Sequence, residues 1–183
     1  MLPLRHAFQL AILFLFLGSF AQAEDGAARK KFEDSCKKGD FKACNSLGDM
    51  EGEAGKKDEA KKLYDKACSG GLALGCANMG YMFSVEGNAA GADKYNRKAC
   101  AAKDWDACAN LGVTLYQAGK KAEARDFYKK ACDNGQLDGC YGLGFVDGEM
   151  GDNKAAKEAF QKGCDAGEKQ SCNALLYLKK KGI

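Results

Sequence analysis

Apolar and small residues return along this chain at a fixed interval of 32 residues. Counting from every second cysteine (Cys44, Cys76, Cys108, Cys140 and Cys172), a leucine or methionine stands at position +3, and a glycine follows at +4 in four of the five copies. An alanine returns at +16, and an aromatic residue stands at +20 in three of four copies. A period of this length is typical of a stack of identical supersecondary units.

Each period is predicted to contain two helices. The first runs from about 0 to +10 and ends at a glycine at +11, as at Gly55 and Gly119. The second carries residues such as Ala60, Tyr64 and Ala67, whose spacings of four and three place them on one helical face. A further glycine follows most second helices, and Lys103 is the exception. The pattern therefore predicts an all-α solenoid of α/α-hairpins with 32-residue repeats.

The predicted solenoid is a single domain over residues 24–183. We expect an N-terminal helix over about 24–43, repeats over 44–75, 76–107, 108–139 and 140–171, and a C-terminal capping helix over 172–183.

The ten cysteines follow the same period, with gaps that alternate between 8 and 24 residues. Either Cys36 bonds Cys44 across the turn between hairpins, or Cys44 bonds Cys68 across one hairpin. The second scheme leaves Cys36 and Cys172 as free thiols, which exported proteins tend to avoid, whereas the first uses every cysteine. We therefore predict the pairs Cys36–Cys44, Cys68–Cys76, Cys100–Cys108, Cys132–Cys140 and Cys164–Cys172.

Residues 1–23 have the pattern of a secretory signal peptide. A basic start at Arg5 precedes the apolar run from Leu10 to Leu17, and small residues up to Ala23 offer a cleavage site. The run is too short to span a bilayer comfortably, so we expect no membrane segment after cleavage. Because disulfides persist mainly in oxidising compartments, export and the cysteine ladder together predict a periplasmic or secreted protein.

Charge and composition argue against several functions. The net charge of +3 is too small to favour nucleic acid as the main partner. The single histidine, His6, lies in the predicted signal, so histidine-based catalysis and histidine-ligated metals are not expected. The cysteine spacing does not fit zinc, and no glycine-rich phosphate loop is present. We expect neither a metal nor a cofactor.

The repeat resembles the tetratricopeptide superfamily. The Leu-Gly pair, the small residue twelve positions later and the aromatic residue four beyond it match that motif. The cysteine pairs, the segment from Met79 to Phe83 and the Lys-Ala-Cys closure of the second helix resemble more specifically the Sel1-like repeats of the Helicobacter cysteine-rich protein family. Repeats in that family usually run a few residues longer than the compact 32 residues found here.

The resemblance implies that a protein or peptide partner binds along a concave face formed by the first helices. Groove positions of the superfamily correspond to +1, +5, +8 and +9 here. Residues at +5 could instead pack between repeats, and the sequence leaves both possibilities open for Tyr81, Phe145 and Tyr177. The residues expected to bind a partner are Tyr81, Tyr116, Tyr141, Phe145, Tyr177, Asn45 and Gln117.

The resemblance also implies an alternative function. Members of the Helicobacter cysteine-rich family are commonly described as penicillin-binding proteins or β-lactamases. Ser35 and Lys38 form an S-x-x-K sequence, the serine–lysine pair of that chemistry, and are the only candidate catalytic residues. The accompanying S-D-N and K-T-G elements are missing, and Lys38 is expected in a turn. A binding scaffold is therefore the favoured reading, and a β-lactamase-like hydrolase is the alternative.

Overall fold

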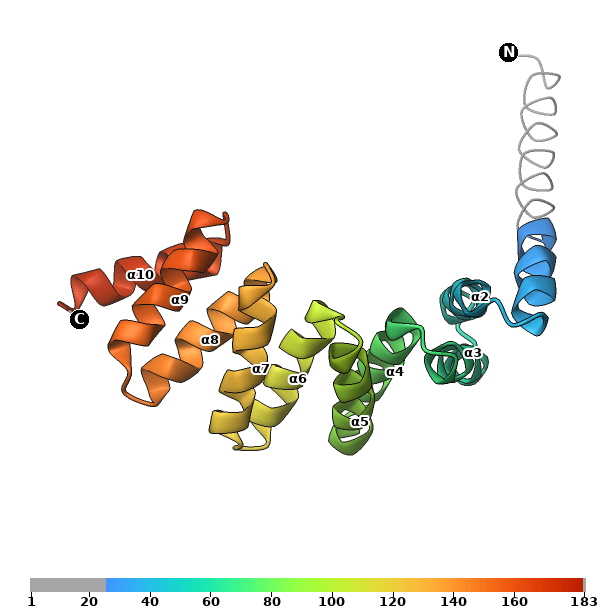
Figure 1. Ribbon diagram of the computed structural model, residues 1–183, viewed down its shortest axis with the longest axis horizontal. Helices are drawn as coiled ribbons and strands as arrows, with labels where there is room; N and C mark the ends of the chain where they lie inside the picture. The colour runs from blue at the N-terminus through green and yellow to red at the C-terminus, as the bar shows by residue number, and fades with distance from the viewer. Residues whose placement is uncertain (1–25, 183) are drawn as a thin grey trace, which may run out of the picture. The chain divides into compact units, whose positions relative to one another are not determined.

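The computed structural model describes residues 26–182, and all regular structure within them is helical (Figure 1). The predicted signal peptide lies outside the described residues. A helix over 26–37 comes first. It is followed by α2 (Phe41–Glu53), α3 (Lys57–Ser69), α4 (Ala73–Val85), α5 (Ala89–Ala101), α6 (Trp105–Gln117), α7 (Lys121–Asp133), α8 (Leu137–Glu149), α9 (Asn153–Asp165) and α10 (Lys169–Lys180). The predicted all-α repeat architecture is confirmed.

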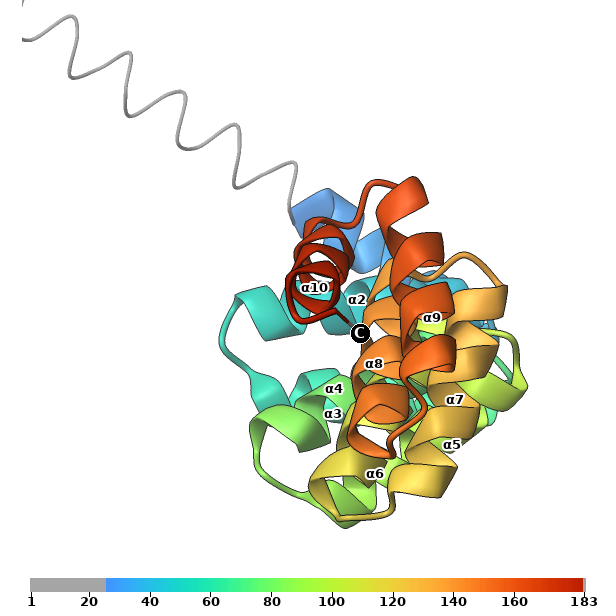
Figure 2. The same ribbon diagram turned by 90° about the vertical axis from the view of Figure 1, so that its left-hand side faces the viewer.

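The described chain divides into two compact units, a shorter one up to Leu63 and a longer one from Tyr64 onward, and the division falls inside α3. The single continuous domain over 24–183 stays a prediction. In the longer unit, each helix from α4 to α10 packs against its neighbours in sequence. The first helices of successive hairpins, α4, α6, α8 and α10, also contact one another directly. The second helices α5, α7 and α9 lie together on the other side (Figure 2). The first helices therefore form one face of this unit.

The first helices begin about three residues before the predicted position. In α2 the carboxylate of Asp40 accepts hydrogen bonds from the backbone N–H groups of Lys42 and Ala43, at 3.0 and 3.1 Å. In α6 Asp104 caps the N–H of Ala107 at 2.9 Å. A side-chain acceptor at the N-cap satisfies donors that a helix start leaves unpaired. The cap at −4, not the cysteine, therefore sets where each of these helices begins.

The core of each hairpin is built from small residues on the second helix. The alanines at +16 are 0 or 1% exposed, which allows the two helices to approach closely. In the longer unit the ring of Tyr128 lies over Gly112, because a Cβ built on that glycine would fall 2.6 Å from the ring. Phe160 lies over Gly144 in the same way, with a separation of 2.7 Å. In these two repeats the aromatic ring at +20 therefore packs on the glycine at +4.

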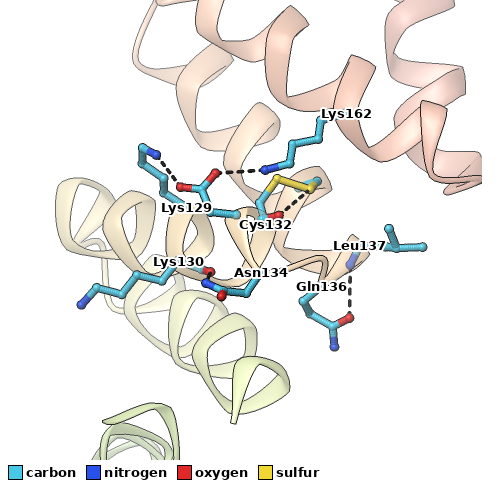
Figure 3. The surroundings of a disulfide bond; sticks show 9 residues. Lys129, Lys130, Cys132, Asn134, Gln136, Leu137 and Lys162 are labelled. Carbon is cyan, nitrogen blue, oxygen red and sulfur yellow. Dashed lines mark hydrogen bonds and ion pairs between the residues drawn. A yellow bond between two sulfur atoms is a disulfide. The ribbon is translucent and has the colours of Figure 1, made fainter. Parts of the chain in front are cut away.

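Five disulfides close the predicted eight-residue steps and use all ten cysteines. The bonded residues have Cα atoms 4.4–4.7 Å apart. Each bond spans the turn between the end of one second helix and the beginning of the next first helix. Figure 3 shows Cys132 at one such turn, where Lys129 and Lys162 both reach the carboxylate of Asp133 at 2.5 and 3.0 Å.

Candidate binding surface

A row of exposed apolar side chains runs along the first helices of the longer unit. Position +5 holds Tyr81 on α4, Val113 on α6, Phe145 on α8 and Tyr177 on α10, with exposed fractions of 63, 43, 42 and 60%. The sequence left open whether residues at this position pack between repeats. The structure shows them on the surface. We call these four side chains the +5 row.

The residues that the sequence predicts to bind a partner do not include Val113. Its repeat register alone would have identified it. Exposed aromatic residues are enriched at protein interfaces and often dominate their binding energy. A regular series of large apolar side chains therefore has the chemistry of a contact surface.

Tyr116 joins two successive first helices beside the +5 row. Its ring packs edge-on against Phe145, with centroids 5.6 Å apart. Its hydroxyl donates a hydrogen bond of 2.8 Å to Glu149, which also pairs with Lys121 at 3.1 Å. The hydrogen bond from Tyr116 and the one from Lys121 hold the pKa of Glu149 below its ordinary value. The expected residues Tyr116 and Phe145 therefore lie together, and polar contacts fix the Tyr116 ring.

A hollow of about 350 Å³ lies next to this pair, between α8, α9 and α10. Tyr141, Phe145, Gly148 and Tyr177 are among the residues that line it. The half-buried ring of Tyr141 packs against Phe160 with centroids 5.8 Å apart. Three of the expected binding residues thus surround one mostly apolar depression. It is large enough for an apolar side chain of a partner.

The other two expected binding residues differ in their surroundings. Gln117 is exposed at the end of α6 and lines a second cavity with Tyr81. Asn45 is only 3% exposed, and its amide donates to Asp49 at 3.2 Å within α2. The side chain of Asn45 is therefore buried, unlike that of Gln117, and its contact with a partner stays a prediction.

Ser35 and Lys38 lie at the end of the helix over 26–37. Ser35 is in its last turn and partly buried, whereas Lys38 is exposed in the turn that follows. The carbonyl of Ser35 accepts a hydrogen bond of 3.0 Å from the N–H of Lys38. The helix ends at residue 37, so Ser35 lies within it and Lys38 lies directly after it.

Residues 26–182 contain no cluster of three or more His, Cys, Asp or Glu side chains suited to a metal ion. Within the same residues, no helix is both long enough and apolar enough to cross a membrane.

Comparisons with known proteins agree with this geometry. The tetratricopeptide repeat matches residues 41–69, which form α2 and α3, and residues 106–133, which form α6 and α7. No curated protein matches the sequence.

Several solved structures are similar to the chain. The antigen c5321 of uropathogenic Escherichia coli, described as having an SLR fold, is 25% identical with a TM-score of 0.75. The match covers 85% of this chain but only 37% of c5321. A Sel1 repeat protein from Oxalobacter formigenes is 24% identical over 76% of this chain and 63% of its own, with a TM-score of 0.63. YrrB, a TPR protein with an unusual peptide-binding site, is 19% identical over 87% of this chain and 86% of its own, with a TM-score of 0.59. The chain is therefore a Sel1- and TPR-like repeat protein in its fold.

Proposed function

We propose that this protein is an exported, disulfide-bonded scaffold that binds a protein or peptide partner through the face of its first helices. The +5 row is the observation that carries the proposal. Four successive first helices expose a large apolar side chain at one repeat position, although each exposed apolar group costs hydration free energy. Helical-repeat proteins use such extended faces to bind partners. The peptide-binding site described for YrrB lends support at the level of the fold.

Affinity capture with a matched pair of variants tests this proposal. The row variant carries Tyr81→Ala, Phe145→Ala and Tyr177→Ala. The control variant carries Leu74→Ala and Met150→Ala, which remove side chains of similar exposure (50 and 51%) that lie off the row. We expect the wild type and the control to capture the same partner and the row variant to lose it. Equal capture by all three proteins would contradict the proposal.

The proposed location rests on the sequence of residues 1–23 together with the five disulfides. Disulfides at every repeat boundary need an oxidising compartment to form. We expect the mature protein to begin at Glu24 and to appear in the periplasm or the medium. N-terminal sequencing of the fractionated protein measures both points, and an intact Met1 in the cytoplasmic fraction would contradict them.

A hydrolase related to the Helicobacter cysteine-rich proteins remains the alternative proposal. It rests on the family resemblance and on the S-x-x-K sequence at Ser35 and Lys38. A nitrocefin assay of the wild type beside Ser35→Ala tests it directly. Turnover by the wild type that Ser35→Ala abolishes would favour the hydrolase over the scaffold.

A further inference from the structure

Asn96 occupies a place that aromatic rings take in the other repeats. Position +20 holds Tyr64, Tyr128 and Phe160 elsewhere. A Cβ built on Gly80 would lie 2.0 Å from Oδ1 of Asn96, so the carboxamide sits over this glycine as Tyr128 sits over Gly112. One repeat therefore has a small polar group where its neighbours have a large ring.

A cavity of about 340 Å³ lies at this site, between α4, α5 and α6. It is of the size that binds small ligands or single side chains. None of its lining residues carries a charge. They include Tyr81, Ser84, Asn96, Asn110, Thr114 and Gln117.

The Asn96 side chain has no hydrogen-bond partner for either of its polar atoms within the described chain. The residue is only 1% exposed, and both Nδ2 and Oδ1 are buried. Buried polar groups in native proteins are almost always hydrogen-bonded, and an unpaired one lowers stability. A buried donor and a buried acceptor on one planar group thus stand unpaired beside a cavity.

The chemistry of this pair restricts what would satisfy it. A group that bonds both atoms must present an acceptor and a donor side by side in one plane. A primary carboxamide does so, because one of its N–H groups lies on the same side as its carbonyl. A trans main-chain peptide unit points its N–H and C=O in opposite directions and cannot bond both atoms at once. A charged side chain would lose hydration without gaining a counter-charge from this lining.

We propose that this cavity binds the side-chain carboxamide of a glutamine or asparagine in a bound peptide. The proposal rests on the proposed function, because Tyr81 belongs both to the +5 row and to the cavity wall. A peptide lying along the row can insert one side chain beside Tyr81. Tyr81 and Gln117 are exposed and line the cavity, whereas the Asn96 carboxamide is shielded, so binding requires a lining side chain to move.

Three capped pentapeptides test the proposal on the full oxidised chain. They have the sequence Gly-Gly-X-Gly-Gly with Gln, Met or Glu at the centre, so that shape and hydrogen bonding are separated. Binding is followed through the side-chain NH₂ resonances of Asn96 in ¹⁵N-labelled protein. We expect the Gln peptide to shift these resonances and to bind at least about tenfold more tightly than the Met peptide, as a lost bidentate contact would cause. Equal affinities for Gln and Met would overturn the proposal.

Variants provide an independent measurement. Asn96→Leu replaces both polar atoms by methyl groups on the same branched skeleton, so it should abolish the preference for Gln while the melting temperature stays equal or rises. Asn134→Leu changes an exposed asparagine in the turn after α7 and should leave binding unchanged. Unchanged Gln binding by Asn96→Leu would overturn the proposal. So would binding of adenosine without the Gln peptide, because adenine also pairs with an asparagine carboxamide.

The two proposals can fail separately. If the row variant loses the captured partner but no Gln preference exists, the scaffold function stands and the carboxamide site is wrong. If the Gln preference depends on Asn96 but the row variant still captures every partner, the carboxamide site stands and the +5 row is not the contact surface.

Discussion

Arg125 of α7 and Asp147 of α8 form an ion pair across a repeat boundary, with a carboxylate that is only 2% exposed and a guanidinium that is 35% exposed. The same arrangement occurs in the shorter unit, where Arg29 pairs at 2.5 Å with Glu51, whose side chain is 8% exposed. Both acids stand at position +7 of their repeats. Arg125 lies seven residues before Cys132, and Arg29 lies seven residues before Cys36. Two other copies of +7 hold the apolar residues Phe83 and Leu115, and the copy in the C-terminal helix holds Lys179. The same repeat position therefore holds an acid paired with arginine in two repeats and an apolar side chain in two others.

The first prediction concerns the Arg125–Asp147 pair. Replacing Arg125 by Met leaves a buried carboxylate without its partner, which costs about 3–5 kcal/mol for a fully buried pair. Because the guanidinium is about one-third exposed, we expect a smaller loss of unfolding free energy, about 1–3 kcal/mol. The double variant Arg125→Met/Asp147→Leu copies the apolar solution of Leu115 and should recover most of this loss. Urea denaturation of the three proteins measures their unfolding free energies. A double variant as unstable as the single variant would contradict the prediction.

The second prediction concerns acid and Glu51. The hydrogen bond from Arg29, the largest cause, holds the pKa of Glu51 below its ordinary value of 4.5. A carboxyl group with a lowered folded-state pKa adds stability above its ordinary pKa and loses it as the pH falls through the folded value. We expect Glu51→Gln to be less stable than the wild type at pH 7 and the difference to shrink as the pH falls below 4.5. Thermal melts across this pH range measure the stability difference between the two proteins. A difference that stays constant with pH would contradict a lowered pKa of Glu51 as its cause.

The third prediction compares two glycines in first helices. Alanine stabilises a helix interior over glycine by up to about 1 kcal/mol. At Gly112 the added methyl group would lie 2.6 Å from the Tyr128 ring, so we expect Gly112→Ala to destabilise by about 1–3 kcal/mol. At Gly148 the nearest atom, the Cβ of Ala156, is 3.8 Å away, and Gly148→Ala should be neutral or stabilising. Equal effects of the two substitutions in denaturant melts would show that helix propensity, and not contact with the Tyr128 ring, determines the change in stability.

The repeat period and the disulfide pairing could be predicted because both follow from the spacing of residues along the chain. The exposure of Tyr81 and Phe145 could not. The helices α4 and α8 carry apolar residues around their whole circumference, so periodicity did not distinguish their buried from their exposed sides. Only the packing of neighbouring helices decides which side is covered.

The cavity beside Asn96 shows a second limit of sequence reasoning. The sequence shows Asn96 as the exception at position +20. Its packing over Gly80 exists only in the folded hairpin and could not be predicted. Asn45 is likewise buried, and its amide donates to Asp49 four residues further along α2. Polar residues inside a repeat array are thus the hardest to place from the sequence.

The fourth prediction concerns the one turn that lacks its glycine. Lys103 has a φ of +66°, the only positive value among non-glycine residues in the described part of the chain. A side chain in this conformation costs about 1–2 kcal/mol, so Lys103→Gly should raise the unfolding free energy by up to about 1 kcal/mol after the entropy cost of glycine. Lys103→Ala removes the same charge but keeps a Cβ at this positive φ, so it should bring no comparable gain. Thermal melts that rank the two variants equally would contradict a strain at Lys103.

The last prediction concerns the disulfides, and it compares a central bond with a terminal one. Each bond closes a short loop and contributes about 2.5 kcal/mol in the chain-entropy account. Cys132 and Cys140 are both 1% exposed within the core of the longer unit, so Cys132→Ala/Cys140→Ala should lower the midpoint of the whole transition. Cys164→Ala/Cys172→Ala releases only α10, which packs on α9 and α8 at the end of the described chain, and should cause local fraying instead.

Hydrogen exchange separates these outcomes, because the terminal variant should lose protection only in α10 while the central one loses it in α7 and α8 as well. A reductant acts on all five bonds and should broaden the transition and shift it strongly downward, since repeats that contact only their neighbours then unfold with less cooperativity. If instead the reduced protein melts sharply near the oxidised midpoint, the packing of Ala, Tyr and Leu between helices alone sets the stability, and the bonds at the turns serve another purpose.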